Sequence, residues 1–311
     1  MISRIDIAAI HALIAPYLRV TPVIDIRLPG IREMVSLKLE MLQHAGSFKA
    51  RGAFANLLND TPPERVAAAS GGNHGAAVAY AARALGISAR IFVPEIANPE
   101  KIARIRNFGA EVVVGGANFA EARLAAEAYM ESSGAVDIHA YDSLPTLMGQ
   151  GTLARDFEEQ SPDLDTVLVA VGGGGLIGGI ASWYGGGIKV IGVESEGCPT
   201  LHAALKAGEP VDVQVSGLAA DSLGAKRIGE NVLPIVKSSV SQTELVSDDD
   251  IRQAQIWLWE NLRLITEPGG ATAFAALLAG KIQPDDQERV GVIICGANIS
   301  PADFSAKLFA D

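Results

Sequence analysis

The stretch GSFKARG, residues 46–52, places one lysine at the predicted start of a helix. Ser47 belongs to the residue types that commonly cap a helix N-terminus, and the run 50–58 that follows has the composition of a helix. In the first turn, the positive end of the helix dipole favours the neutral form of the Lys49 amine. A neutral, partly desolvated amine can hold an aldehyde as a Schiff base. Lys49 is therefore a candidate covalent anchor, and the alternative is a solvated surface lysine beside a helix start.

On both sides of this stretch, short apolar segments alternate with longer amphipathic ones. We expect strands at residues 35–39, 66–69, 89–93, 111–114, 166–171, 188–193 and 290–295. Short strands that alternate with helices predict an α/β fold in which mainly parallel sheets are flanked by helices. The alternation occurs in two blocks, so we expect two sheets with a ligand-binding cleft between them, at the carboxyl ends of the strands.

Composition limits the classes of function. The chain has 311 residues, 49% of them apolar, and a formal net charge of −11. That charge would repel nucleic acids and acidic membranes, so we expect neither as a partner. The N-terminal residues lack the apolar core of a signal peptide, and no segment is long and apolar enough for a membrane span.

The cysteines and histidines give no sign of a disulfide or a metal site. Cys198 and Cys295 lie far apart without a C-x-x-C pattern, which favours a cytoplasmic protein with free thiols. None of the five histidines pairs with another at ligand spacing, so we expect no zinc.

A run of four glycines, 172–175, follows the apolar strand segment directly and precedes a predicted helix. Backbone amides at such a turn can converge on a phosphate. Two ligands fit this pattern. One is a compact phosphate monoester. The other is a dinucleotide, because Gly173, Gly175 and Gly178 satisfy G-x-G-x-x-G and Glu194 ends the next strand. A tight turn without a ligand is the third interpretation.

The chain resembles the serine/threonine dehydratase family of fold-type II enzymes, which use pyridoxal 5'-phosphate (PLP), and it also resembles serine racemase. The resemblance covers nearly the whole chain and rests on GSFKARGA (46–53), SGGNHG (70–75), GQGT (149–152), VGGGGLIGGIA (171–181), EPGGA (267–271) and CGAN (295–298). It implies a fold like the tryptophan synthase β-subunit, with two domains and an active site in the cleft between them. The large domain would comprise residues 1–64 and 144–311, and the small domain residues 65–143.

The resemblance also implies which residues hold the cofactor. Lys49 would bind PLP covalently with Phe48 beside it, and Asn73 would hydrogen-bond the 3'-hydroxyl. Cys295 would face the pyridine nitrogen, with Glu267 nearby. The phosphate would rest on Gly172, Gly173, Gly174, Gly175 and Leu176.

For the substrate, the motif at 70–75 offers a second helix start. We expect the carboxylate at Ser70, Gly71, Gly72 and the backbone of His74, whose ring is a candidate either for catalysis or for packing under the loop. The resemblance places Tyr141 and Asp221, or the adjacent Ser222, near the substrate side chain. A hinge and a solvated loop are the respective alternatives.

Gly71 and Thr200 are departures from related patterns. Racemases that resemble this family carry a serine at the position of Gly71, so glycine favours elimination over racemisation. Thr200 stands where relatives with a cation site carry a second acid near Glu194, so we expect no tightly bound metal.

The sequence thus predicts a PLP-dependent dehydratase that converts L-threonine or L-serine to a 2-oxo acid and ammonia, as a cytoplasmic homodimer. The alternatives are an NAD-dependent dehydrogenase, a non-catalytic PLP carrier, and a PLP lyase for another hydroxy amino acid such as 3-hydroxyaspartate, phenylserine or a hydroxyectoine-derived acid.

Overall fold

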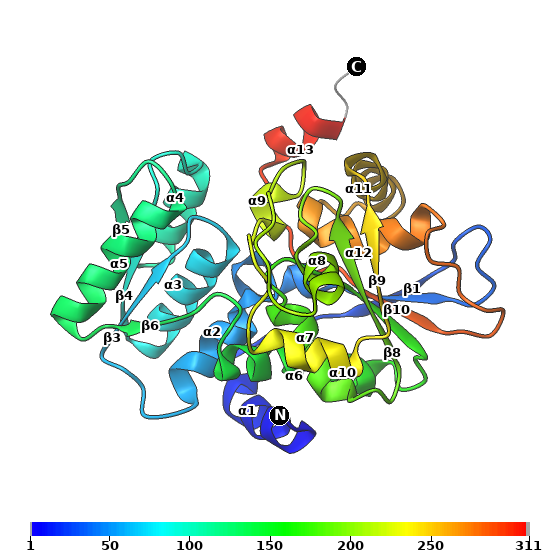
Figure 1. Cartoon of the computed structure of the whole chain (residues 1–311), viewed down its shortest axis with the longest axis horizontal. Helices are drawn as coiled ribbons and strands as arrows, with labels where there is room; N and C mark the ends of the chain where they lie inside the picture. Colours follow the sequence, from blue (N-terminus) through cyan, green and yellow to red (C-terminus); the bar gives the residue numbers. More distant parts are fainter. Residues whose placement is uncertain (1, 309–311) are drawn as a thin grey trace.

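Two separate sheets organise this computed structural model, which describes residues 2–308 (Figure 1). The larger sheet has the order β1-β2-β10-β7-β8-β9, and only its β1–β2 pair is antiparallel. Its strands are β1 (Val23–Ile26), β2 (Val35–Lys38), β7 (Thr166–Ala170), β8 (Lys189–Ser195), β9 (Gln242–Val246) and β10 (Val290–Ile293). The mainly parallel arrangement that the sequence predicts is confirmed for this sheet.

The smaller sheet is parallel throughout and has the order β5-β4-β3-β6. Its strands are β3 (Arg65–Ala69), β4 (Ser88–Val93), β5 (Glu111–Val114) and β6 (Val136–Asp137), and its helices are α3 (Asn73–Leu85), α4 (Pro99–Asn107) and α5 (Phe119–Ser133). We call these elements the four-stranded unit and the rest of the described chain the six-stranded unit. The predicted domain limits at residues 65 and 143 stay a prediction.

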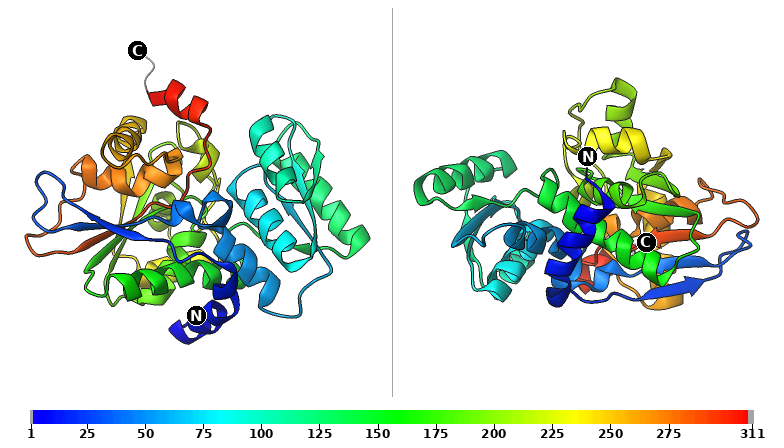
Figure 2. Two further views of the ribbon diagram at one scale, coloured as in Figure 1. Left: turned by 180° about the vertical axis from the view of Figure 1, so that it is seen from behind. Right: turned by 90° about the horizontal axis from the view of Figure 1, so that it is seen from below.

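Alternation along β3 explains why helices cover both faces of the smaller sheet. Val66 and Ala68 belong to one buried cluster with residues of α3 and α4, whereas Ala67 and Ala69 belong to another with Ala126 of α5. Successive side chains of a strand point to opposite faces, so a strand of small apolar residues can be buried on both. Figure 2 shows these layers from two further sides.

The remaining described helices belong to the six-stranded unit, and some of them pack on the larger sheet. They are α1 (Arg4–Ile14), α2 (Lys49–Leu58), α6 (Leu144–Gln160), α7 (Gly175–Tyr184), α8 (Thr200–Ala207), α9 (Ala220–Leu223), α10 (Val232–Ser239), α11 (Asp248–Leu262), α12 (Pro268–Leu278) and α13 (Pro301–Leu308). Three short 3-10 turns, η1 (Ala15–Tyr17), η2 (Glu40–Leu42) and η3 (His44–Gly46), complete the described elements. No helix among residues 2–308 has the length and apolar content needed to cross a membrane.

Glycines bring α6 and α7 into close contact, and this contact positions the start of α7. A Cβ atom on Gly179 would lie 2.4 Å from the carbonyl oxygen of Leu147 and 2.5 Å from the backbone nitrogen of Gly151. No side chain fits between backbones at that distance. The glycines of GQGT and of GLIGG therefore fix how α7 enters the site.

One local prediction is wrong. Ser47 does not cap α2, because the cap residue is Phe48 and no side chain caps this helix start. The backbone of Ser47 is extended and pairs with Gly296 in an isolated bridge. The Ser47 hydroxyl is buried without a hydrogen-bond partner. Pairing with the segment after β10 thus determines where Lys49 lies.

Candidate functional site

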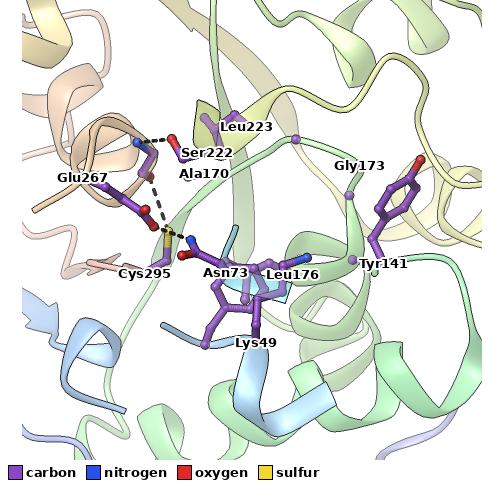
Figure 3. A pocket seen from close by; sticks show the side chains of 15 residues that line it. Lys49, Asn73, Tyr141, Ala170, Gly173, Leu176, Ser222, Leu223, Glu267 and Cys295 are labelled. Carbon is purple, nitrogen blue, oxygen red and sulfur yellow. Dashed lines mark hydrogen bonds between the residues drawn. The ribbon is translucent and has the colours of Figure 1, made fainter. Parts of the chain in front are cut away.

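A pocket lies at the carboxyl ends of β7 and β10, where the two units meet (Figure 3). Its lining includes every residue that the sequence predicts for the cofactor, and Tyr141. It also includes residues that the sequence does not single out, namely Ala170, Leu223 and Gly269, and Ser222, which was one of two alternatives. The lining residues come from segments that lie far apart in the chain. The two central strands, β7 and β10, are parallel, and parallel neighbours are joined by long connections.

Lys49 reaches this pocket from the start of α2. Its Nζ donates a hydrogen bond to the carbonyl of Ala140 at 2.7 Å. Burial lowers the pKa of the Lys49 amine to about 8, although the nearby acidic groups of Cys295 and Glu267 act in the opposite direction. The neutral, nucleophilic form of this amine is therefore far more accessible than that of an exposed lysine.

Lys38 is a second buried lysine, and no sequence pattern singles it out. Burial also lowers its pKa to about 8. However, its Nζ lies outside the pocket lining and donates to the carbonyl of Thr21 at 2.7 Å and to Oε1 of Gln160 at 2.6 Å. The surroundings of Lys38 thus satisfy its ammonium group and leave it away from the pocket.

The glycine turn follows β7 and opens α7. Gly174 is the N-cap residue with φ of 88°, a conformation that favours glycine, and no side chain caps the helix. The first amides of a helix have no partners within it, so an uncapped start offers them to a ligand. The turn is also crowded from outside, because a Cβ on Gly173 would lie 2.5 Å from the Tyr141 ring and one on Gly175 2.8 Å from the Tyr141 Cα.

Glu194 is not available to bind a ribose, as the acid at this position of a dinucleotide-binding fold would do. Its carboxylate accepts hydrogen bonds from the backbone amides of Leu201 and His202, each at 2.7 Å, at the start of α8. Capping that helix occupies the acid that the dinucleotide interpretation needs for a ribose. Among the described residues, no three or more histidine, cysteine or acidic side chains form a group that could hold a metal ion.

Cys295 and Glu267 lie on the opposite wall of the pocket. Burial raises the pKa of the Cys295 thiol, whose Sγ donates to the carbonyl of Gly269 at 3.3 Å. The thiol is therefore neutral near pH 7. Burial also raises the pKa of Glu267 to about 7, while a hydrogen bond of 2.6 Å from Nδ2 of Asn73 opposes that shift.

The segment before α3 is a second uncapped helix start. Its N-cap residue is Gly72, which has no side-chain cap, and the Gly72 amide donates to the Ser70 hydroxyl at 3.3 Å. Ser70, Gly71 and Gly72 precede the lining residue Asn73 but lie outside the lining themselves. Their predicted contact with the substrate carboxylate stays a prediction.

His74 is also outside the lining. Its ring Nε2 is 2.6 Å from the carbonyl oxygen of Ile138, and burial lowers the pKa of the ring to about 3. The neutral ring thus donates to that carbonyl. Of the two alternatives for the imidazole, this arrangement favours packing under the loop.

Asp221 and Ser222 lie on α9 and face different ways. The Asp221 carboxylate is largely exposed and forms an ion pair with Lys101 of α4 instead of lining the pocket. Ser222 lines the pocket, and its hydroxyl accepts a hydrogen bond from the Gly269 amide at 2.9 Å. Sequence reasoning missed Lys101, whose only signal is a cation on the cleft side of the helix at 99–107.

Comparisons with known proteins agree with this geometry. Residues 14–296 match the family model described as "Pyridoxal-phosphate dependent enzyme". The chain is 38% identical to a phenylserine dehydratase from Ralstonia pickettii, over 97% of this chain and 95% of that protein. It is 37% identical to an L-threonine ammonia-lyase from Geobacter sulfurreducens, over 87% of this chain and 69% of that protein. The solved structure of maize serine racemase superposes with a TM-score of 0.92 at 30% identity, covering 99% of this chain and 97% of that chain.

Proposed function

The chain belongs to the family of pyridoxal-phosphate dependent enzymes, and we propose that it eliminates water from a β-hydroxy amino acid such as L-threonine or L-serine. The unsaturated amine left by that elimination takes up one water, so the final products would be a 2-oxo acid and ammonia. The buried amine of Lys49, facing an uncapped glycine turn across one pocket, is the observation that carries the proposal. Relatives that are named as dehydratases and ammonia-lyases support the reaction type.

The residues present fit the cofactor of this family. The amides from Gly172 to Leu176 would hold the phosphate, and the Lys49 amine would take the aldehyde. A Cβ atom on Gly173 or Gly175 would collide with the Tyr141 segment, so glycine is required at these two positions of the turn. On the other wall, the neutral Cys295 thiol would face the ring nitrogen, with Phe48, Asn73 and Glu267 around the ring.

When bound, pyridoxal phosphate supplies an aldehyde that takes an amino group covalently and a ring that withdraws electrons from the α-carbon. Lys49 then acts on protons. Its neutral Nζ would accept the proton from the α-carbon of the substrate, which the lowered pKa of this amine favours. Cys295 keeps its proton on Sγ, so it adds no charge beside the ring.

Gly71 supports elimination over racemisation. Racemisation needs a second proton-exchanging group on the face of the substrate opposite the lysine, and glycine has none. A Cβ at Gly71 would lie 3.2 Å from the Cβ of Ala97, so a side chain here would be tight.

A panel of β-hydroxy amino acids tests the function. Purified enzyme with PLP should release 2-oxo acid and ammonia from L-threonine or L-serine, and the panel would include 3-hydroxyaspartate, a hydroxyectoine-derived acid and phenylserine, the substrate that names one relative. Release from none of them would favour a non-catalytic PLP carrier. Borohydride reduction and peptide mapping should find the cofactor on Lys49. An adduct on Lys38, or none, would contradict the proposed site.

Three further proposals concern the whole protein. Residues 65–143 would form the small domain, since all strands of the smaller sheet lie within this range. The enzyme would act as a homodimer, because Leu13, Tyr17 and Val20 expose apolar side chains along one N-terminal segment. A cytoplasmic location is supported by the two free, buried cysteines.

A further inference from the structure

Four side chains form a continuous hydrogen-bond chain between the two units. Nη1 of Arg104 donates to Oδ1 of Asn298, and Nδ2 of Asn298 donates to Oδ1 of Asn73. Nδ2 of Asn73 then donates to Oε1 of Glu267 at 2.6 Å, an interaction drawn in Figure 3. Arg104 and Asn73 belong to the four-stranded unit, while Asn298 and Glu267 belong to the six-stranded unit.

The neighbours of Asn298 determine which way its amide points. Its NH2 group donates to the carbonyl of Ala45 at 2.8 Å as well as to Asn73, and its oxygen faces a guanidinium group, which can only donate. A reversed amide would set its oxygen against two acceptor oxygens and its NH2 group against the guanidinium. Arg104 therefore supplies the donor that the oxygen end of this buried amide requires.

The orientation of Asn298 in turn determines that of Asn73. The Asn73 oxygen is taken by Asn298, so the Asn73 NH2 group faces Glu267 and the pocket. An amide NH2 group has two hydrogens, and Glu267 accepts one of them. The other remains for a ligand in the pocket that Asn73 lines.

Gly46 makes room for this chain within the lysine stretch itself. It has φ of 76°, and a Cβ there would lie 2.3 Å from Oδ1 of Asn298 and 3.6 Å from Nη2 of Arg104. Any side chain would push Asn298 away. Gly46 thus has two roles: it adopts a backbone conformation that favours glycine, and it leaves space for the side chain of Asn298.

We propose that Arg104 is a positioning residue, which acts through Asn298 to keep the donor end of Asn73 facing the cofactor pocket. Arg104 itself lies outside the pocket and on its outer side is open to solvent. The inference rests on the proposed function, in which Asn73 contacts the cofactor ring. Since all three links of the chain cross between the units, the donor end of Asn73 is set only when the units have this arrangement.

The test compares Arg104→Met with Arg106→Met in the PLP-loaded enzyme. Arg106 lies on the same helix and is exposed, so it is a matched control. Losing one hydrogen bond of this kind changes an equilibrium by about twofold to tenfold. Arg104→Met should therefore raise the dissociation constant for PLP by that factor and shift the visible absorption band of the bound cofactor, or its pH midpoint. Arg106→Met should change neither. Arg104→Lys keeps a donor, so its affinity for PLP and its absorption band should stay closer to those of the wild type.

A double-variant cycle distinguishes action through Asn298 from a direct effect of charge on Glu267. In an Asn298→Ala background, adding Arg104→Met should have no further effect on affinity or absorption. An equal effect in both backgrounds, or no effect of Arg104→Met in the wild type, would overturn the inference. If Asn298→Ala does not fold, the comparison of Arg104→Met with Arg104→Lys decides instead. If the wild type itself does not bind PLP, the proposed function fails, which is a separate outcome.

Discussion

Lys38 and Lys49 are both buried lysines, and burial lowers the pKa of each to about 8. A lowered pKa alone therefore does not identify the reactive amine. Lys38 has two hydrogen-bond acceptors at its Nζ, and an acceptor stabilises the ammonium form. Lys49 has one acceptor and an open pocket beside it. At the residue scale, what distinguishes the two is access and unfilled hydrogen-bonding capacity.

The pKa of Lys49 predicts how cofactor uptake depends on pH. Below about pH 8 the amine of the cofactor-free enzyme is mostly protonated, so the neutral fraction falls about tenfold per pH unit. The rate of covalent PLP uptake should rise with pH and level off near pH 8, and stopped-flow absorbance measures it. An exposed lysine would still gain reactivity up to about pH 10.

Pyridoxine 5'-phosphate provides the control for that measurement, because it lacks the aldehyde. Its binding should show no midpoint near pH 8. If both ligands showed the same midpoint, another group would be responsible. Glu267, whose pKa burial raises to about 7, would be the first candidate.

Cys295 leads to a second prediction at this scale. A neutral thiol cannot protonate the ring nitrogen as a carboxylic acid would. The ring therefore withdraws electron density from the α-carbon less strongly. Cys295→Asp should lower the elimination rate and add detectable transamination, measured as amino-group transfer to the cofactor in single-turnover experiments. Unimpaired elimination without transamination would contradict the assigned role of the thiol.

At the scale of elements, the glycine turn depends on a neighbour that no local pattern reveals. A Cβ on Gly175 would meet the backbone of Tyr141 at 2.8 Å, whereas one on Gly178 would meet only side-chain ends, with Leu147 nearest at 3.1 Å and Val232 at 3.5 Å. Gly175→Ala should therefore displace the turn and raise the dissociation constant for PLP about tenfold, as expected for one or two weakened phosphate hydrogen bonds. Gly178→Ala should change it by about twofold or less. Fluorescence titration measures both, and equal effects would contradict the assigned crowding.

The strands and helices that were predicted from the sequence are those whose apolar pattern is complete within the segment. β7 is buried along its whole length and was predicted within one residue. β9, QTELV, was missed because it lies at the sheet edge and is mostly polar and half-buried. β1 was missed for a similar reason, since it is a four-residue edge strand with only Ile26 buried.

The residues of the site were likewise predicted only where their pattern is complete within one short segment. Lys49, Asn73 and the glycine turn lie in compact motifs, so the sequence identified them. Arg104 and Lys101 bind partners 194 and 120 residues away, so no local spacing could reveal them. Asn298 lay in a recognised motif, but its contact with Asn73 depends on the tertiary fold.

At the scale of the whole molecule, α4 joins α3 in binding the four-stranded unit to the six-stranded unit beside the site. Lys101 and Arg104, one turn apart, reach Asp221 and Asn298 respectively. Both partners lie next to pocket residues, Ser222 and the segment after Cys295. The relative position of the units and the geometry of the pocket are thus determined by the same contacts.

The exposed apolar surface carries the last prediction, that of a homodimer. The Val20 side chain is 82% exposed in the segment after α1, and the neighbouring Leu13 and Tyr17 also face solvent. Exposed apolar side chains that lie close together in the chain are typical of an interface, because apolar surface is costly in water. The wild type should therefore sediment at about twice the chain mass of 32.4 kDa, and Val20→Asp should yield a monomer because it buries a charge at the contact. Leu124→Asp, an equivalent change at a 65% exposed position on α5, should leave the dimer intact. A dimer that survives Val20→Asp but not Leu124→Asp would place the interface on the four-stranded unit instead.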